Sequence, residues 1–90
     1  MTIVTDKPVD ELTKAISSRA DLVAFIRQLR CDLRDDPATW ENVTLDSYME
    51  AMAAWTEDSD GYYQNAGLPI PKTTSWQTLA DILLAAKSYE

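Results

Sequence analysis

The residues with the most chemical potential lie in one run, WTEDSDGYYQN, at positions 55–65. Carboxylates at this density suggest a calcium loop, an acid–base pair or a surface for a basic partner. A calcium loop places oxygen ligands at positions 1, 3 and 5, glycine at 6 and glutamate at 12. With Gly61 at position 6, Asp58 and Asp60 fall at 3 and 5, but threonine and glycine occupy 1 and 12. Two anchoring ligands are missing, so we expect no metal site and no cofactor.

Catalysis is the function that the composition opposes most clearly. Asp58 and Asp60 could perturb each other's pKa in a deep site, but a chain of 90 residues has little volume for one. The sequence has no histidine, which excludes serine–histidine triads and the usual proton shuttle near neutral pH. Cys31 lies among arginines without a histidine base, so a half-buried structural cysteine is expected. We therefore expect no enzymatic activity and no catalytic residue.

The acidic residues that give the net charge of −7 are concentrated in the middle of the chain. Residues 35–71 hold eight acids and no Lys or Arg, whereas the parts before and after them sum to +1 and zero. A nucleic-acid-binding module normally presents a basic face, so direct nucleic-acid binding is disfavoured. The acidic segment predicts either a solvated surface or a patch that attracts a basic protein.

Aromatic residues interleaved with these acids favour the binding hypothesis. Trp40, Tyr48 and Trp55 are expected in the core or at its edge. The two adjacent tyrosines diverge by about 100° on a helix, so one of them should reach the surface. Tyrosine is a favoured interface anchor, and surrounding acids steer a basic partner. The predicted partner-binding residues are Glu50, Glu57, Asp58, Asp60, Tyr62, Tyr63 and Asn65.

The spacing of apolar residues predicts helices along the chain and no strand. A short helix is expected over 8–16, after a frayed stretch at 1–7. A second helix begins after the capping residue Ser18 and ends before Pro37, which disfavours helical backbone at the residue preceding it. The core face of this second helix is predicted to contain Leu22, Phe25, Ile26, Leu29 and Leu33.

Two more helices are expected after a turn or short 3-10 segment at 36–42. Thr44 caps the first, which ends either at Gly61 or at Gly67. Ser75 caps the second. Their predicted core faces contain Leu45, Tyr48, Met49, Met52 and Trp55 in the first, and Trp76, Leu79, Ala80, Ile82, Leu83 and Ala86 in the second. The chain is thus predicted to form one all-α domain over 1–90, a small three- to four-helix bundle.

Cellular location is constrained by what the sequence lacks. No apolar run reaches the ~20 residues of a membrane-spanning helix, and the first residues do not form a basic region followed by an apolar one, as a secretory signal would. Cys31 is the only cysteine, so the chain cannot form an internal disulfide. We expect a cytoplasmic protein with no membrane partner.

Three blocks of sequence resemble a group of short, acidic, uncharacterised bacterial proteins classed as a domain of unknown function. They are WENVTLDSY at 40–48, AWTEDSDGYY at 54–63, and Ser75-Trp together with the end LAAKSYE at 84–90. The similarity runs from about Ser17 to the end of the chain. It implies a stand-alone bacterial domain, and it implies no activity and no catalytic residue.

The expected function is a non-catalytic binding protein that engages a basic protein partner through the acidic and aromatic residues. An immunity protein that covers a toxin, or an inhibitor of a nuclease, would have this character. The alternative is a homodimeric structural or regulatory domain, in which the aromatic and methionine faces pair with a second copy.

Overall fold

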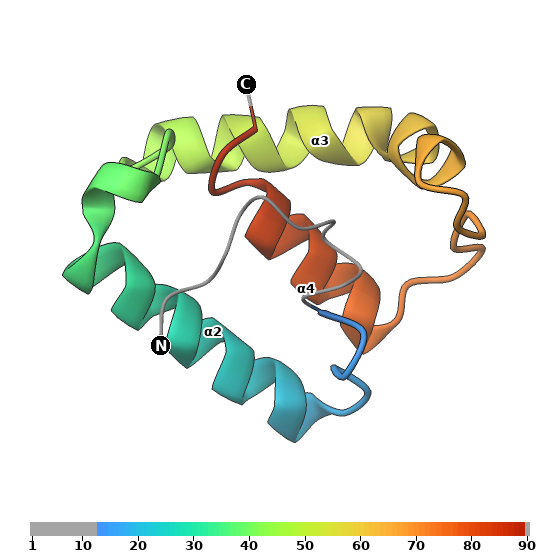
Figure 1. The fold of residues 1–90 in the computed structure, drawn as a ribbon, viewed down its shortest axis with the longest axis horizontal. Coiled ribbons are helices and arrows are strands. Elements are labelled where there is room, and N and C mark those ends of the chain that lie inside the picture. Colours follow the sequence, from blue (N-terminus) through green and yellow to red (C-terminus); the bar gives the residue numbers. More distant parts are fainter. Residues whose placement is uncertain (1–12, 90) are drawn as a thin grey trace.

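The all-α bundle predicted from the sequence is confirmed by the computed structural model, which describes residues 13–89 (Figure 1). Its elements are α2 (Arg19–Asp35), the 3-10 turn η1 (Pro37–Thr39), α3 (Leu45–Asn65) and α4 (Trp76–Ala85). No strand occurs in this described part of the chain.

The remaining positions, 1–12 and 90, lie outside the described residues. The stretch at 1–7 that was expected to fray, and most of the short helix expected over 8–16, fall among them.

The three long helices begin where the sequence predicts. Ser18, Thr44 and Ser75 are the N-caps, and each hydroxyl accepts a hydrogen bond at 3.1 Å from the backbone amide three residues further on. These bonds satisfy amides that the first helical turn leaves without a partner. Helix α2 ends at Asp35, before the proline. Helix α3 continues through Gly61 and ends before Gly67, whose φ of 72° is the left-handed conformation that glycine adopts easily.

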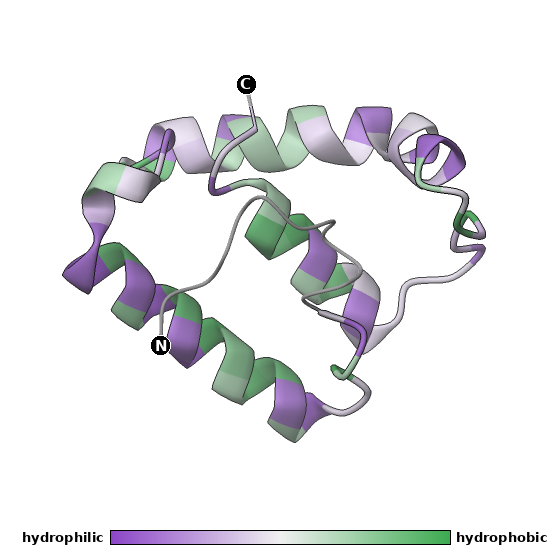
Figure 2. Cartoon of the chain, in the orientation of Figure 1, coloured by the Kyte–Doolittle hydropathy of each residue, from purple (hydrophilic) through white to green (hydrophobic). Residues whose placement is uncertain are grey.

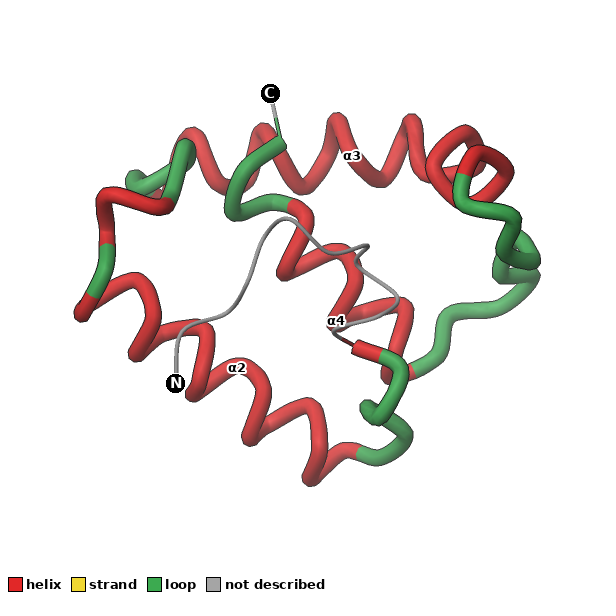
Figure 3. The backbone as a smooth tube through the Cα atoms, in the orientation of Figure 1, coloured by secondary structure: helices red, strands yellow, loops and turns green. Residues whose placement is uncertain are grey.

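Helix α4 lies between α2 and α3 and packs against both (Figure 1). The backbones of α2 and α3 do not approach each other closely along their lengths. A loop at 66–75 joins α3 to α4 (Figure 3). Apolar residues follow the side of α2 that faces α4 (Figure 2). The main core cluster consists of Leu22, Phe25, Leu29, Trp40, Ala80 and Leu84, and a second cluster consists of Trp55, Tyr63 and Ala85.

Three predicted core faces differ from the observed ones. On α2, Ile26 is 44% exposed, because α4 covers the side of the helix formed by Leu22, Phe25 and Leu29. On α3, Trp55 is buried, but Leu45 and Met49 are 74% and 58% exposed. Because only α4 packs against α3, the apolar side of α3 is wider than its neighbour can cover. On α4, Trp76 and Leu79 are exposed, and the buried side includes Asp81, Leu84 and Ala85.

A buried ion pair joins α2 to the residues that follow α4. Lys87 Nζ lies 2.8 Å from Asp32 Oδ2, and the two side chains are 0% and 1% exposed. The same carboxylate oxygen accepts a hydrogen bond at 2.9 Å from Trp40 Nε1. The ammonium group also lies 5.6 Å from the centroid of the Trp40 ring. Burying two charges costs free energy that only close pairing and good hydrogen bonding offset, and this cluster supplies both.

Backbone bonds at the end of α4 hold the segment that leads into α3. The amides of Glu41 and Asn42 donate to Lys87 O at 3.1 and 3.2 Å. The Asn42 side chain donates to Ala86 O and Tyr89 O at 3.0 and 2.8 Å. These bonds satisfy carbonyls that a helix end leaves without intrahelical partners, and they fix where α3 starts.

A second buried carboxylate connects three parts of the chain. Asp81 of α4 accepts a hydrogen bond from Tyr63 Oη of α3 at 2.7 Å and another from the hydroxyl of Thr13. Asp81 is 2% exposed. A buried carboxylate needs such donors to be stable, so this bond draws Tyr63 into the core.

Replacing Lys87 with Met should strongly destabilise the protein, because Asp32 would remain buried without its counter-charge. The expected loss is about 3–5 kcal/mol, a large share of the ~5–15 kcal/mol typical of a domain. The double variant Asp32→Asn/Lys87→Met removes both charges and keeps an acceptor for Trp40, so it should regain much of this loss. Urea unfolding followed by circular dichroism measures both. A double variant as unstable as the single one would show that the unpaired charge is not the cause.

Candidate partner-binding site

All seven predicted partner-binding residues lie on α3, but on different sides of it. Three of the predicted acids, together with a fourth acid that was not among the seven, are exposed and fall within about 80° of one another around the helix. These residues, called the acidic stripe below, are Asp46, Glu50, Glu57 and Asp60. Within the described residues, none of the four forms an ion pair or a side-chain hydrogen bond. The stripe is therefore a negative surface with no internal neutralisation.

Asp58 has a different role from the acidic stripe. Its Oδ2 accepts a hydrogen bond at 2.5 Å from Tyr89 Oη, which ties the end of the described chain to α3. This bond raises the pKa of the Tyr89 hydroxyl above its usual 10.0. Because residues two apart on a helix diverge by about 200°, Asp58 and Asp60 lie on different sides of α3 and do not crowd each other.

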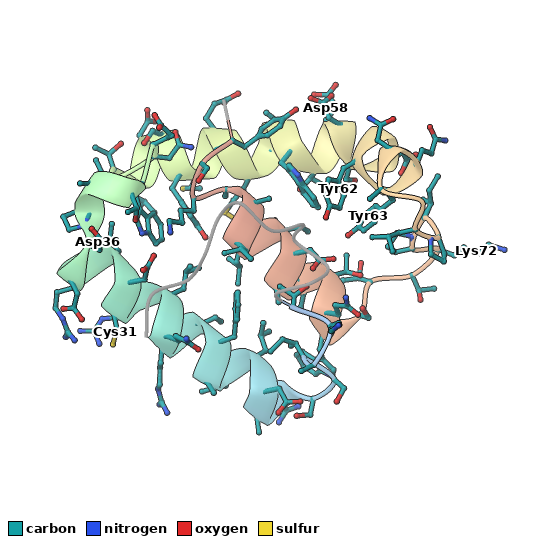
Figure 4. All side chains as sticks on the ribbon, in the orientation of Figure 1. Cys31, Asp36, Asp58, Tyr62, Tyr63 and Lys72 are labelled. Atoms are coloured by element: carbon teal, nitrogen blue, oxygen red, sulfur yellow. The ribbon has the colours of Figure 1, made fainter. Side chains whose placement is uncertain are left out.

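The two adjacent tyrosines, Tyr62 and Tyr63, pack mainly in the core and contribute little to the surface. Tyr63 is 4% exposed and its ring meets Trp55 edge-on, with centroids 6.1 Å apart. Tyr62 is half-buried and its ring lies 5.5 Å from the same tryptophan. Figure 4 shows both tyrosines turned toward the interior of the bundle while Asp58 points outward. Asn65 is exposed at the last residue of α3. The structure therefore places Tyr63 in the core instead of the predicted contact surface.

An apolar groove, which the sequence did not reveal, runs along α3 where α2 fails to reach it. It consists of two adjoining hollows of about 340 and 540 Å³ that share Leu83 of α4. Arg30 lies on the α2 rim of the first hollow. The side chains called the apolar groove below are Ile26, Val43, Leu45, Met49, Leu79 and Leu83. Five of these six are more than a third exposed, so the groove is open to solvent.

Tyr48 forms part of the wall of the first hollow and is held rigidly. Its hydroxyl donates to Leu83 O at 2.6 Å, and its ring centroid lies 5.9 Å from that of Trp40. Burial raises the pKa of this hydroxyl to about 12. The groove wall is thus attached to the main core through named contacts.

In the described part of the chain, no cluster of three or more His, Cys, Asp or Glu residues could hold a metal ion. Cys31 is half-buried, as expected, and accepts a hydrogen bond on Sγ from Arg34 Nη2 at 3.5 Å. None of the helices described is long and apolar enough to cross a membrane.

The fold and the site define a small all-α domain whose distinguishing surfaces are an acidic stripe and an adjoining apolar groove. The chain belongs to a family of unknown function, DUF7660, whose model matches residues 18–90. The resemblance noted in the sequence is therefore confirmed at the level of an uncharacterised family. No curated protein and no solved structure matches the chain.

The buried Tyr48 should make stability depend on pH in the alkaline range. Its folded-state pKa of about 12 exceeds the unfolded value of 10.0, so the unfolded chain loses this proton first. Stability from this group is complete below pH 10.0 and is lost as pH rises through the folded pKa. Tyr89 contributes in the same direction. Urea unfolding at successive alkaline pH values should show a shallower decline for Tyr48→Phe. An equal decline in wild type and variant would contradict this assignment.

Proposed function

We propose that the protein is a non-catalytic binding domain that engages a basic protein partner through α3. The observation that carries this proposal is the acidic stripe, whose four exposed carboxylates have no partner within the described residues. The stripe lies in a segment, 35–71, that contains no Lys or Arg. An uninterrupted negative surface of this kind attracts a positive partner and accelerates its association.

The contact surface differs from the one predicted from the sequence. Glu50, Glu57 and Asp60 form its centre, and Asp46 and Asn65 lie toward the two ends of α3. Asp58, which is hydrogen-bonded to Tyr89, and the half-buried Tyr62 lie outside this surface, on the other flank of α3, and Tyr63 packs in the core. An immunity protein or inhibitor that covers a basic enzyme, such as a toxin or a nuclease, would present a surface of this chemistry.

Reversing charge on the acidic stripe should abolish partner capture. Glu57→Lys/Asp60→Lys is compared with Asp35→Lys/Glu41→Lys, which changes the net charge equally at exposed acids away from the stripe. Immobilised protein is exposed to lysate of the organism that encodes it, at low and at high salt. Wild type and control should retain a basic protein at low salt only, because salt screens the attraction between exposed charges. Retention of the same protein by the stripe variant would refute the proposal.

A homodimer is the alternative proposal, and the exposure of Leu45 and Met49 favours it. The net charge of −7 opposes it, because like-charged copies repel each other and a large net charge keeps proteins monomeric.

Sedimentation equilibrium should therefore show the 10.1 kDa monomer at low micromolar concentration. A dimer that persists there and survives Glu57→Lys/Asp60→Lys would favour the alternative over the proposal.

A further inference from the structure

The apolar groove brings several exposed hydrocarbon side chains together in one place. Leu45 is 74% exposed and Val43 is 52% exposed at the end of α3 where the groove begins. Met49 lies one turn further along the same edge of α3 and is 58% exposed. A contiguous exposed apolar patch of this kind usually marks an interaction surface.

The groove has the length and shape that suit a helix. Its α3 edge extends from Leu45 to Thr56, which at 1.5 Å per residue is roughly 17 Å, or about three helical turns. Its floor is Leu83 of α4 and its other wall is α2. Apolar grooves of this kind accept amphipathic helices whose anchors recur every three or four residues. The flexible methionine side chains of α3 can adapt to such an occupant.

The charges around the groove determine which helix fits. The acidic stripe follows the outer side of α3, next to the edge formed by Leu45 and Met49. The opposite rim carries Arg30, which forms no ion pair among the described residues. A second copy of this chain brings a charge of −7 with it, so long-range repulsion opposes that occupant. A helix with cations along one edge is attracted instead.

We propose that the apolar groove binds a basic amphipathic helix of the partner protein. Its apolar side packs on Leu45, Met49 and Leu83, and its Lys or Arg residues lie beside the acidic stripe. This inference rests on the proposed function and adds the structural element by which the partner is held. Because Arg30 occupies the other rim, the cations of the helix face α3 and the α2 edge of the helix is neutral or acidic.

The test uses a fluorescein-labelled model peptide of four helical turns, built from leucine and lysine in an amphipathic pattern, and fluorescence anisotropy. Its controls are a scrambled peptide of the same composition and an amphipathic peptide with glutamate in place of lysine. The expected order of affinity is amphipathic leucine–lysine first, the scrambled peptide well below it, and the glutamate peptide last. Equal affinity for the amphipathic and scrambled peptides, or no binding of the former, would overturn the proposal.

Matched variants locate the binding. Leu45→Gln/Met49→Gln removes apolar contacts without changing charge and should weaken the peptide at least ~10-fold. Val23→Gln changes a 39% exposed apolar residue that does not line the groove, and it should leave affinity unchanged. Circular dichroism checks that each variant keeps its helices.

The outcomes separate this inference from the proposed function. If Glu57→Lys/Asp60→Lys weakens peptide binding while Leu45→Gln/Met49→Gln does not, the groove proposal fails and the acidic stripe remains the binding surface. If neither variant weakens peptide binding, neither the groove nor the acidic stripe is the binding surface and both proposals fail. A wild-type dimer that Leu45→Gln/Met49→Gln dissociates in sedimentation would assign the groove to a second copy and overturn the proposal.

Discussion

The buried ion pair between Asp32 and Lys87 is the interaction on which the rest of the bundle depends. It joins α2 to the turn after α4, positions that are 55 residues apart, and it fixes the indole of Trp40 through the same carboxylate. Lys87 also accepts the backbone bonds of residues 41 and 42 on its carbonyl. One residue thus anchors α2 through its side chain and the start of α3 through its backbone.

This arrangement explains why the candidate site exists. Helix α3 is placed by its ends and by α4, and its backbone stays apart from that of α2. The gap between the two helices becomes an apolar groove, and the outer side of α3 keeps its carboxylates in solvent. The hydrogen bond from Tyr48 to Leu83 and that from Tyr63 to Asp81 hold α3 on α4. A rigid helix that carries adjoining acidic and apolar surfaces is suited to binding a partner, and this is why binding is the function proposed.

The helices could be predicted from the sequence because they depend on interactions between nearby residues. The contacts between residues far apart in the sequence could not be predicted in this way. The caps Ser18, Thr44 and Ser75 could be read from the sequence because capping depends on residues three positions apart. Asp32 follows Leu29 at helical spacing on a core face, which was a readable signal of a buried carboxylate. No local rule identifies its distant partner, Lys87. The groove exists because the backbones of α2 and α3 stay apart, and no local sequence rule predicts that separation. Tyr63 lies in the core because its hydroxyl donates a hydrogen bond to Asp81 on another helix.

The most direct test of α3 as the binding element is amide chemical-shift mapping by NMR during titration with the leucine–lysine peptide. The account predicts that the shifted amides cluster on the groove edge and the acidic stripe, at Leu45, Met49 and Glu57. It predicts little change at Asp58, which lies on the other flank of α3, and at Tyr89, which is hydrogen-bonded to Asp58. Shifts centred on Asp58 and Tyr89, with the groove edge unchanged, would contradict it.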